Sequence, residues 1–212
     1  MIDDILQCME GITEIKRKDW SIVYNPEFEQ YKEKYKNIVS TVNRVMAGEK
    51  IENFENEMLG YSTGGKAYSV VEVAGEKFFI KKIPENHKQG GVEEFKAALE
   101  AKNRLRDGGI KNVKVVDYVF GYSSDKVRFV VSRYDSRLKT TLALYMDECV
   151  EKKKYNELHK LDHRFADLKK LFADYFDFKV QNMAYDKDTD EIILFDLNNF
   201  ENKLIESTDD EL

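Results

Sequence analysis

Four polar side chains of the kinds that bind phosphate and divalent cations lie near the end of this 212-residue sequence. Asp177 and Lys179 come first, Asn182 follows, and Asp196 stands after a short apolar run. Mg²⁺ accepts one or two protein oxygens together with substrate phosphates. Asn182 and Asp196 are therefore candidate metal ligands, with Asp177 facing a transferred phosphoryl group and Lys179 neutralising it.

A β-hairpin would bring the two candidate ligands together. The run VQNMAY, the polar turn DKDTD and the run EIILFD read as strand, turn and strand, which places Asn182 beside Asp196. The alternative is that Asp177 caps a helix and Asp196 caps a turn, with no ligand. A calcium loop is excluded, because Glu191 and Leu197 stand where that loop needs Gly and Glu.

A glycine-rich segment and a lysine on an apolar strand form a second group. Residues 59–67, LGYSTGGKA, could bring backbone N–H groups close to a phosphate, or could simply build a turn. In the strand FFIKKI, Lys81 lies among apolar residues and must either extend to solvent or meet an anion, whereas Lys82 points to the opposite face. On the next helix we prefer Glu94 as that anion, since it borders the buried face, and Glu100 remains a rival.

These groups sit on an α+β pattern with three parts. Residues 1–58 read as mostly helical, 59–135 as β-β-α-β-β with an antiparallel sheet, and 136–212 as mostly helical before the final hairpin. The sequence therefore predicts a helical N-terminal extension, a β lobe with one helix, and a helical lobe.

Composition and charge exclude several function classes. The net charge of −6 provides no general attraction to nucleic acid, and no apolar run reaches the length of a membrane span. Cys8 and Cys149 are too few and too far apart for a disulfide framework. We expect a protein of a reducing compartment, the cytoplasm.

The four motifs, in this order, resemble the protein-kinase-like superfamily. DFKVQN resembles the catalytic loop, LFDLN the metal-binding segment, FFIKKI the lysine strand and LGYSTGGKA the Gly-rich loop. The resemblance covers about residues 59–200. It implies a two-lobed kinase-like fold with a truncated C-lobe, and ATP and Mg²⁺ between the lobes.

The resemblance also implies roles for individual residues. Lys81 would contact the α- and β-phosphates, held by Glu94 or Glu100, while Asp177 would orient and deprotonate the acceptor hydroxyl and Lys179 would assist at the γ-phosphate. Asn182 and Asp196 would hold Mg²⁺. The nucleotide would be bound by the loop and the hinge 130–135, at Gly60, Ser62, Gly64, Gly65, Ala67, Ser132 and Tyr134.

The departures from the pattern set the alternatives. Ser62 replaces a loop glycine, Tyr175-Phe176 replaces His-Arg, and Asn198 replaces the glycine after the metal aspartate. The sequence ends at Leu212, soon after Asp196, so we expect no activation segment and no gating by loop phosphorylation.

This minimal form resembles small Ser/Thr kinases that bacteria export into host cells, and lipopolysaccharide-core sugar kinases. We expect a protein kinase, and Lys179 favours it. The alternatives are a sugar or small-molecule kinase and a pseudokinase binding module. The expected partners are a protein substrate or a small-molecule hydroxyl acceptor, together with an activating protein.

Overall fold

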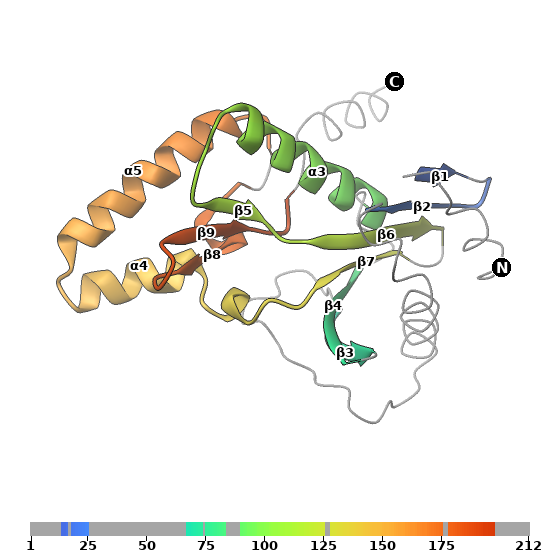
Figure 1. Cartoon of the computed structure of the whole chain (residues 1–212), viewed down its shortest axis with the longest axis horizontal. Coiled ribbons are helices and arrows are strands. Elements are labelled where there is room, and N and C mark those ends of the chain that lie inside the picture. Colours follow the sequence, from blue (N-terminus) through green and yellow to red (C-terminus); the bar gives the residue numbers. More distant parts are fainter. Residues whose placement is uncertain are drawn as a thin grey trace, which may run out of the picture. The chain divides into compact units, whose positions relative to one another are not determined.

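The computed structural model describes residues 14–16, 18–25, 67–73, 75–83, 90–125, 128–175 and 178–197. These residues form an α+β fold with three α-helices and two sheets (Figure 1). The chain divides into two compact units. Unit 1 comprises Met1–Lys96 and Asp117–Tyr134, and unit 2 comprises Ala97–Val116 and Asp135–Leu212. The division expected from the sequence, into 1–58, 59–135 and 136–212, stays a prediction.

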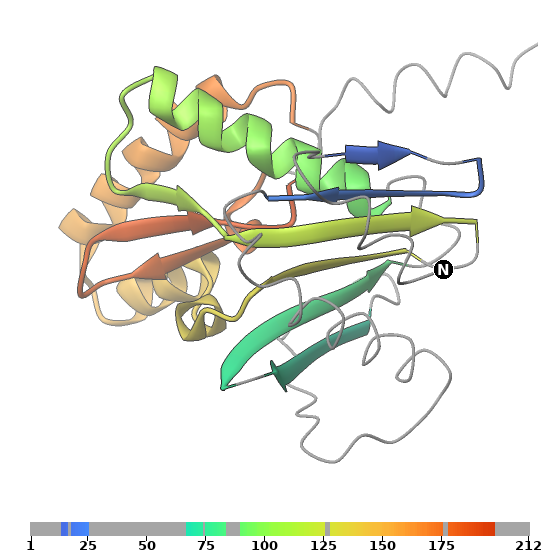
Figure 2. The same cartoon turned by 45° about the vertical axis from the view of Figure 1, so that its right-hand side comes forward.

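Unit 1 contains a six-stranded antiparallel sheet in the order β1-β2-β6-β7-β4-β3 (Figure 2). Two of its four later strands precede helix α3 in sequence and two follow it, as expected, although a further short strand, β5, intervenes before β6. The turn after β3 has Gly75 at a φ of 78°, a conformation that glycine adopts without strain. The bounds are β3 Ala67–Val73, β4 Glu76–Ile83, α3 Gly91–Asp107, β6 Tyr118–Ser124 and β7 Arg128–Arg133.

The expectation of helix across residues 1–58 is wrong for the part that the structure describes. β1 (Glu14–Lys16) and β2 (Trp20–Tyr24) form a hairpin, and β2 pairs with β6. The run WSIVY consists largely of aromatic and β-branched residues, which favour strands. Ile22, Val23 and Tyr24 are buried, and the pairing with β6 fixes the strand. Residues 26–58, which were also expected to be mostly helical, lie outside the described residues.

Helix α3 begins in very close contact with the sheet. A Cβ atom at Gly91 would lie 1.9 Å from the carbonyl oxygen of Phe129, and one at Gly121 would lie 2.1 Å from the carbonyl oxygen of Gly91. No side chain fits at either position. The two glycines therefore allow the backbone of the helix to touch β6 and β7.

The free N–H groups of this helix end are capped by two different elements. Glu93 accepts a hydrogen bond from the N–H of Gly90 at 3.0 Å, as in a capping box. Ser123 of β6 accepts one from the N–H of Val92 at 3.3 Å, the role that an N-cap side chain usually has. Glu93 therefore serves the helix end.

Unit 2 contains the rest of α3, two further helices and a three-stranded sheet in the order β5-β9-β8 (Figure 1). The final hairpin is confirmed, with β8 antiparallel to β9. One feature was unexpected: Val113–Val115 form β5, which runs parallel to β9 instead of continuing into β6. The bounds are β5 Val113–Val115, the short helix η2 Ser136–Lys139, α4 Leu142–Glu151, α5 Tyr155–Leu171, η3 Val180–Asn182, β8 Met183–Asp186 and β9 Glu191–Leu194.

Membrane insertion finds no support in the described helices, none of which is both apolar enough and long enough to cross a bilayer. Cys149 of α4 is a free, buried thiol.

The glycine contact predicts a stability difference. Gly121→Ala would force β6 and α3 apart, and we expect it to lower the free energy of unfolding by about 2 kcal/mol. Gly75→Asn is the control, because that turn has open space and asparagine tolerates positive φ. Urea unfolding of both variants checks this. Equal stability of the two variants would contradict the contact.

Candidate functional site

The first candidate group is a buried ion pair in unit 1. The Nζ atom of Lys81, on β4, lies 2.5 Å from Oε2 of Glu94, on α3. Both residues are 3% exposed. The hydroxyl of Tyr118, the first residue of β6, donates to Oε1 of the same carboxylate at 3.0 Å. The Glu94 carboxylate is thus held on both oxygens and faces the Lys81 ammonium group.

The structure distinguishes the two acidic candidates on α3. The predicted pairing of Lys81 with Glu94 is present, while Glu100 binds Nη2 of Arg104 and keeps a side chain that is 42% exposed. Glu94 lies on the same helix face as the buried Ala98 and Ala101, which explains its burial. The position of Glu94 on the buried face of the helix therefore predicted the partner of Lys81 correctly.

Strand β4 presents its two lysines as expected. Lys81 is buried and Lys82 is exposed, because successive side chains of a strand point to opposite faces. Phe78 and Ile80, on the Lys82 face, are also buried. Both faces of the strand are therefore covered near Lys81.

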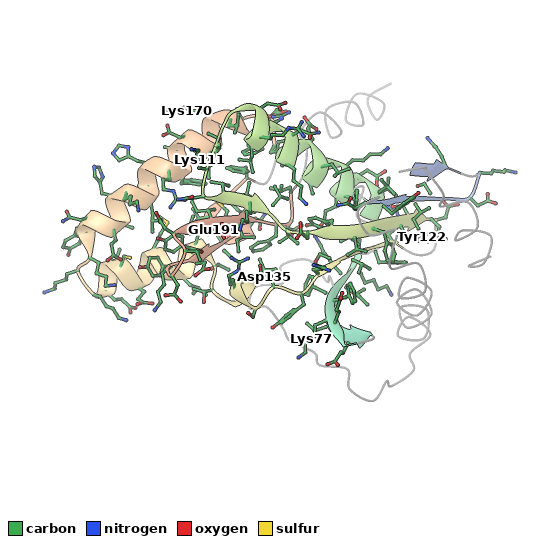
Figure 3. The ribbon with its side chains drawn as sticks, viewed as in Figure 1. Lys77, Lys111, Tyr122, Asp135, Lys170 and Glu191 are labelled. Atoms are coloured by element: carbon green, nitrogen blue, oxygen red, sulfur yellow. The ribbon has the colours of Figure 1, made fainter. Side chains whose placement is uncertain are left out.

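The expected hinge residues end β7. Ser132 is buried and lies opposite Phe79 in the register. The N–H of Tyr134 donates to the carbonyl oxygen of Lys77 at 3.0 Å, and the Lys77 ammonium lies 5.9 Å from the centre of the Tyr134 ring. An adenine ring could therefore use this N–H only by displacing that bond. Lys77 is labelled in Figure 3.

An arginine that the sequence analysis missed organises the chain just after Tyr134. Arg137 binds Asp135 with Nε and Nη2, at 2.9 and 2.6 Å, and Asp135 also accepts from the N–H of Arg137. Nη1 of Arg137 reaches Glu191 at 3.0 Å and Asp186 at 3.4 Å. Asp135 and Glu191 are labelled in Figure 3. The pair of Asp135 and Arg137 is only two residues apart in sequence, a spacing that carries no distinctive signal.

The second candidate group is in unit 2, where Asn182 directly precedes β8 and Asp196 follows β9. Nδ2 of Asn182 donates to the carbonyl oxygen of Asp196 at 3.4 Å, and the N–H of Phe195 donates to the carbonyl oxygen of Asn182 at 3.0 Å. The predicted proximity of Asn182 and Asp196 is confirmed. Asn182 is 7% exposed, and Asp196 has a φ of 52°, an uncommon conformation for a residue other than glycine.

The chemistry of these two residues suits a hard cation. Carboxylate and amide oxygens are ligands for Mg²⁺, which takes few protein ligands and completes its shell with water and phosphate. Because Nδ2 of Asn182 faces the Asp196 carbonyl, Oδ1 is the amide atom that would serve as a ligand. Within the described ranges, no group of three or more His, Cys, Asp or Glu side chains is placed to bind a metal.

Aromatic residues fix the loop between α5 and η3 on either side of Asp177. Tyr175 packs against Phe172, with ring centres 5.2 Å apart. Phe178 stacks on the other side, 4.8 Å from Phe172 and 6.2 Å from Phe165 of α5. Lys179 is exposed and extended. Sequence reasoning identified this loop from its polar residues and did not identify the aromatic residues that anchor it.

Several predicted site residues lie outside the described residues. They include Asp177 and four positions of the Gly-rich loop, Gly60, Ser62, Gly64 and Gly65. Ala67 is the first residue of β3.

His159 and His163 are adjacent on α5, with Nε2 atoms 3.1 Å apart, and both are exposed. Two imidazoles alone fall short of the three protein ligands of a catalytic zinc site.

Compared with known proteins, the sequence matches no protein-family model and no curated protein at a significant level. The evidence for function is therefore the geometry described above together with the motif pattern.

The ion pair predicts which glutamate matters for stability. Glu94→Ala would leave the buried Lys81 ammonium without its carboxylate, and we expect it to lower the free energy of unfolding by about 3 kcal/mol. Glu100→Ala removes a partly exposed pair and is expected to cost less than about 1 kcal/mol. Urea unfolding compares the two variants, and a reversed order would show that Glu100 is the structural partner.

The Arg137 cluster predicts a change in acid stability. Hydrogen bonds from Arg137 lower the pKa of Asp135 below its ordinary value. The stability from this interaction is therefore complete above the unfolded pKa of about 4 and is lost as the pH falls through the folded pKa.

In Arg137→Met we expect a shallower loss of stability between pH 5 and about 2, measured by urea unfolding at several pH values. Arg106→Met is the control, because the exposed Arg106 binds the adjacent Asp107. Parallel pH curves for the wild type and Arg137→Met would contradict the prediction.

Proposed function

We propose that the protein is an ATP- and Mg²⁺-dependent phosphotransferase that acts on a hydroxyl group, with serine or threonine of a protein as the first acceptor to test. The observation that carries the proposal is the buried pair of Lys81 and Glu94. In protein kinases, a lysine on a strand of the sheet is paired with a glutamate on the helix that follows, and this pair must form before phosphoryl transfer. Here β4 and α3 supply the two residues in that order.

The energetics of this pair favour a functional role over a structural one. A buried ion pair is weak evidence for stability, since well-packed apolar residues are often as stable or more so. Lys81 is instead held by Glu94, which is itself held by Tyr118, so its ammonium group has a fixed position from which it can bind an anion. Tyr118 supports this role, because its hydroxyl fixes the carboxylate that holds the lysine.

The Asn182–Asp196 arrangement in unit 2 supplies the second line of support. An asparagine before the final hairpin and an aspartate after it match the kinase metal site both in residue type and in their order along the chain. Mg²⁺ bound there would neutralise charge on the triphosphate. Asn182 and Asp196 would hold it, and Asp196 lies just beyond the end of β9 with a left-handed backbone.

The proposed reaction is a single displacement. The acceptor oxygen bonds to the γ-phosphorus, the bond between that phosphorus and the β,γ-bridging oxygen breaks, and ADP leaves with the electron pair. Asp177 accepts the proton of the acceptor hydroxyl. Lys81 would bind the α- and β-phosphates, and Lys179 would neutralise charge on the γ-phosphate.

The test is transfer of labelled phosphate from ATP in the presence of Mg²⁺. The wild-type chain is incubated alone, with a general protein acceptor, and with core oligosaccharide. We expect labelling of protein, and a loss of more than about 100-fold in Lys81→Met, Asp177→Asn and Asp196→Asn, because each removes a charge needed at the transition state. Lys82→Met is the matched control, since its side chain is exposed beside Lys81 on the same strand.

The same experiments distinguish the alternative functions. Labelling of the oligosaccharide alone would identify a sugar kinase. Calorimetric binding of ATP without transfer would identify a pseudokinase. Absence of both binding and transfer would refute the proposal.

A further inference from the structure

One face of α3 holds the segment that leads into Asp177. Arg104 forms a two-pronged ion pair with Asp174, with Nη1 2.5 Å from Oδ1 and Nη2 2.5 Å from Oδ2. Nη1 also donates to the carbonyl oxygen of Leu171 at 3.3 Å, at the end of α5. Glu100, one turn earlier on α3, binds the guanidinium from its own helix. All of these residues belong to unit 2.

Tyr175 forms a second attachment to the same helix face. Its hydroxyl donates to the carbonyl oxygen of Ala97 at 2.8 Å, and the guanidinium carbon of Arg104 lies 5.1 Å from its ring centre. The residue is 5% exposed, and burial raises its pKa, so the hydroxyl remains protonated at neutral pH and continues to donate. Arg104 therefore contacts both Asp174 and Tyr175.

Folding stability alone does not explain the precise geometry of this cluster. The side chains of Arg104 and Asp174 are 26% and 39% exposed, and ion pairs of that exposure contribute little to folding. A planar guanidinium with two parallel bonds fixes the direction of its partner as well as its distance. The hydrogen bond from Arg104 also lowers the pKa of Asp174, which keeps that carboxylate charged.

We propose that Arg104 is a positioning residue for the segment 171–175, which leads into Asp177 in the sequence, and that it acts through Asp174 and Tyr175. The proposal rests on the proposed function, because Asp177 is the group that would orient the acceptor hydroxyl. Tyr175 stands where the kinase pattern has histidine, and its ring and hydroxyl tie the loop to α3 together with Arg104. A small displacement of a catalytic group costs a large factor in rate while substrate binding is retained.

The test compares Arg104→Met with Arg106→Met. Both changes remove a charge from the last turns of α3, but Arg106 is exposed and binds the adjacent Asp107. In phosphate transfer from ATP we expect Arg104→Met to lower kcat by about 10- to 100-fold with the KM for ATP within about twofold of wild type. Arg106→Met should leave both unchanged. A kcat of Arg104→Met equal to that of Arg106→Met would overturn the proposal.

Two milder variants cover the case in which Arg104→Met is poorly folded. Arg104→Lys keeps the charge and loses the planar fork, and Tyr175→Phe loses the hydroxyl that binds Ala97. We expect each to lower kcat by a factor between wild type and Arg104→Met, at unchanged KM for ATP. Full activity in both would overturn the geometric role.

Amide hydrogen exchange separates this inference from the proposed function. In Arg104→Met we expect faster exchange across residues 172–182 than in Arg106→Met, whether or not the wild type transfers phosphate. A wild type that neither binds ATP nor transfers phosphate refutes the proposed function, and the exchange rates still decide whether Arg104 orders the loop. Unchanged exchange would overturn the inference by itself.

Discussion

An ammonium group and a carboxylate are both strongly hydrated, so a lysine enters a protein interior only where an anion meets it at close range. Lys81 and Glu94 meet this requirement in unit 1, and much of that unit follows from it. The lysine comes from β4, the glutamate from the first turn of α3, and Tyr118 from β6. A glutamate side chain is short, so the start of the helix must lie close to the sheet.

The glycine contact between α3 and β6 satisfies that condition. With no side chain at Gly91 or Gly121, the helix backbone approaches the strands directly, and Ser123 of β6 takes part in capping the helix. The capping bond, the backbone contact and the ion pair thus all result from the way the start of α3 packs on the sheet. Each of them fixes the rotation of the helix about its axis, which decides that Glu94 rather than its neighbour Glu93 faces the lysine.

Local patterns in the sequence predicted the parts of the structure that depend on neighbouring residues. The proximity of Asn182 and Asp196 across the final hairpin and the opposite orientations of Lys81 and Lys82 follow from strand periodicity and turn chemistry. Glu94 was correctly preferred from helical geometry. The functional roles of these residues stay predictions, as does the binding of nucleotide by the loop containing Gly64.

Features that depend on distant pairing escaped prediction. β2 is fixed by its pairing with β6, a strand about 100 residues later in the sequence. Its assignment therefore needed knowledge of that distant partner. Only Val116 and Asp117 separate β5 from β6. Even so, β5 pairs with β9 in the sheet of unit 2, whereas β6 belongs to the sheet of unit 1. The bonds from Arg104 to Asp174 and from Arg137 to Glu191 join residues far apart in sequence. Neither arginine lies in a motif, and no local pattern marks it.

The contact between Gly91 and Gly121 has a consequence for how this fold diverges. A mutation at either glycine is blocked by the main chain of the other element, which no repacking of side chains relieves. The two positions would therefore be constrained together in any descendant that keeps the buried pair of Lys81 and Glu94. A descendant that loses the pair would be released from the restriction at both places. Paired retention or paired loss of these glycines would thus record, in distant descendants, whether the lysine had kept its role.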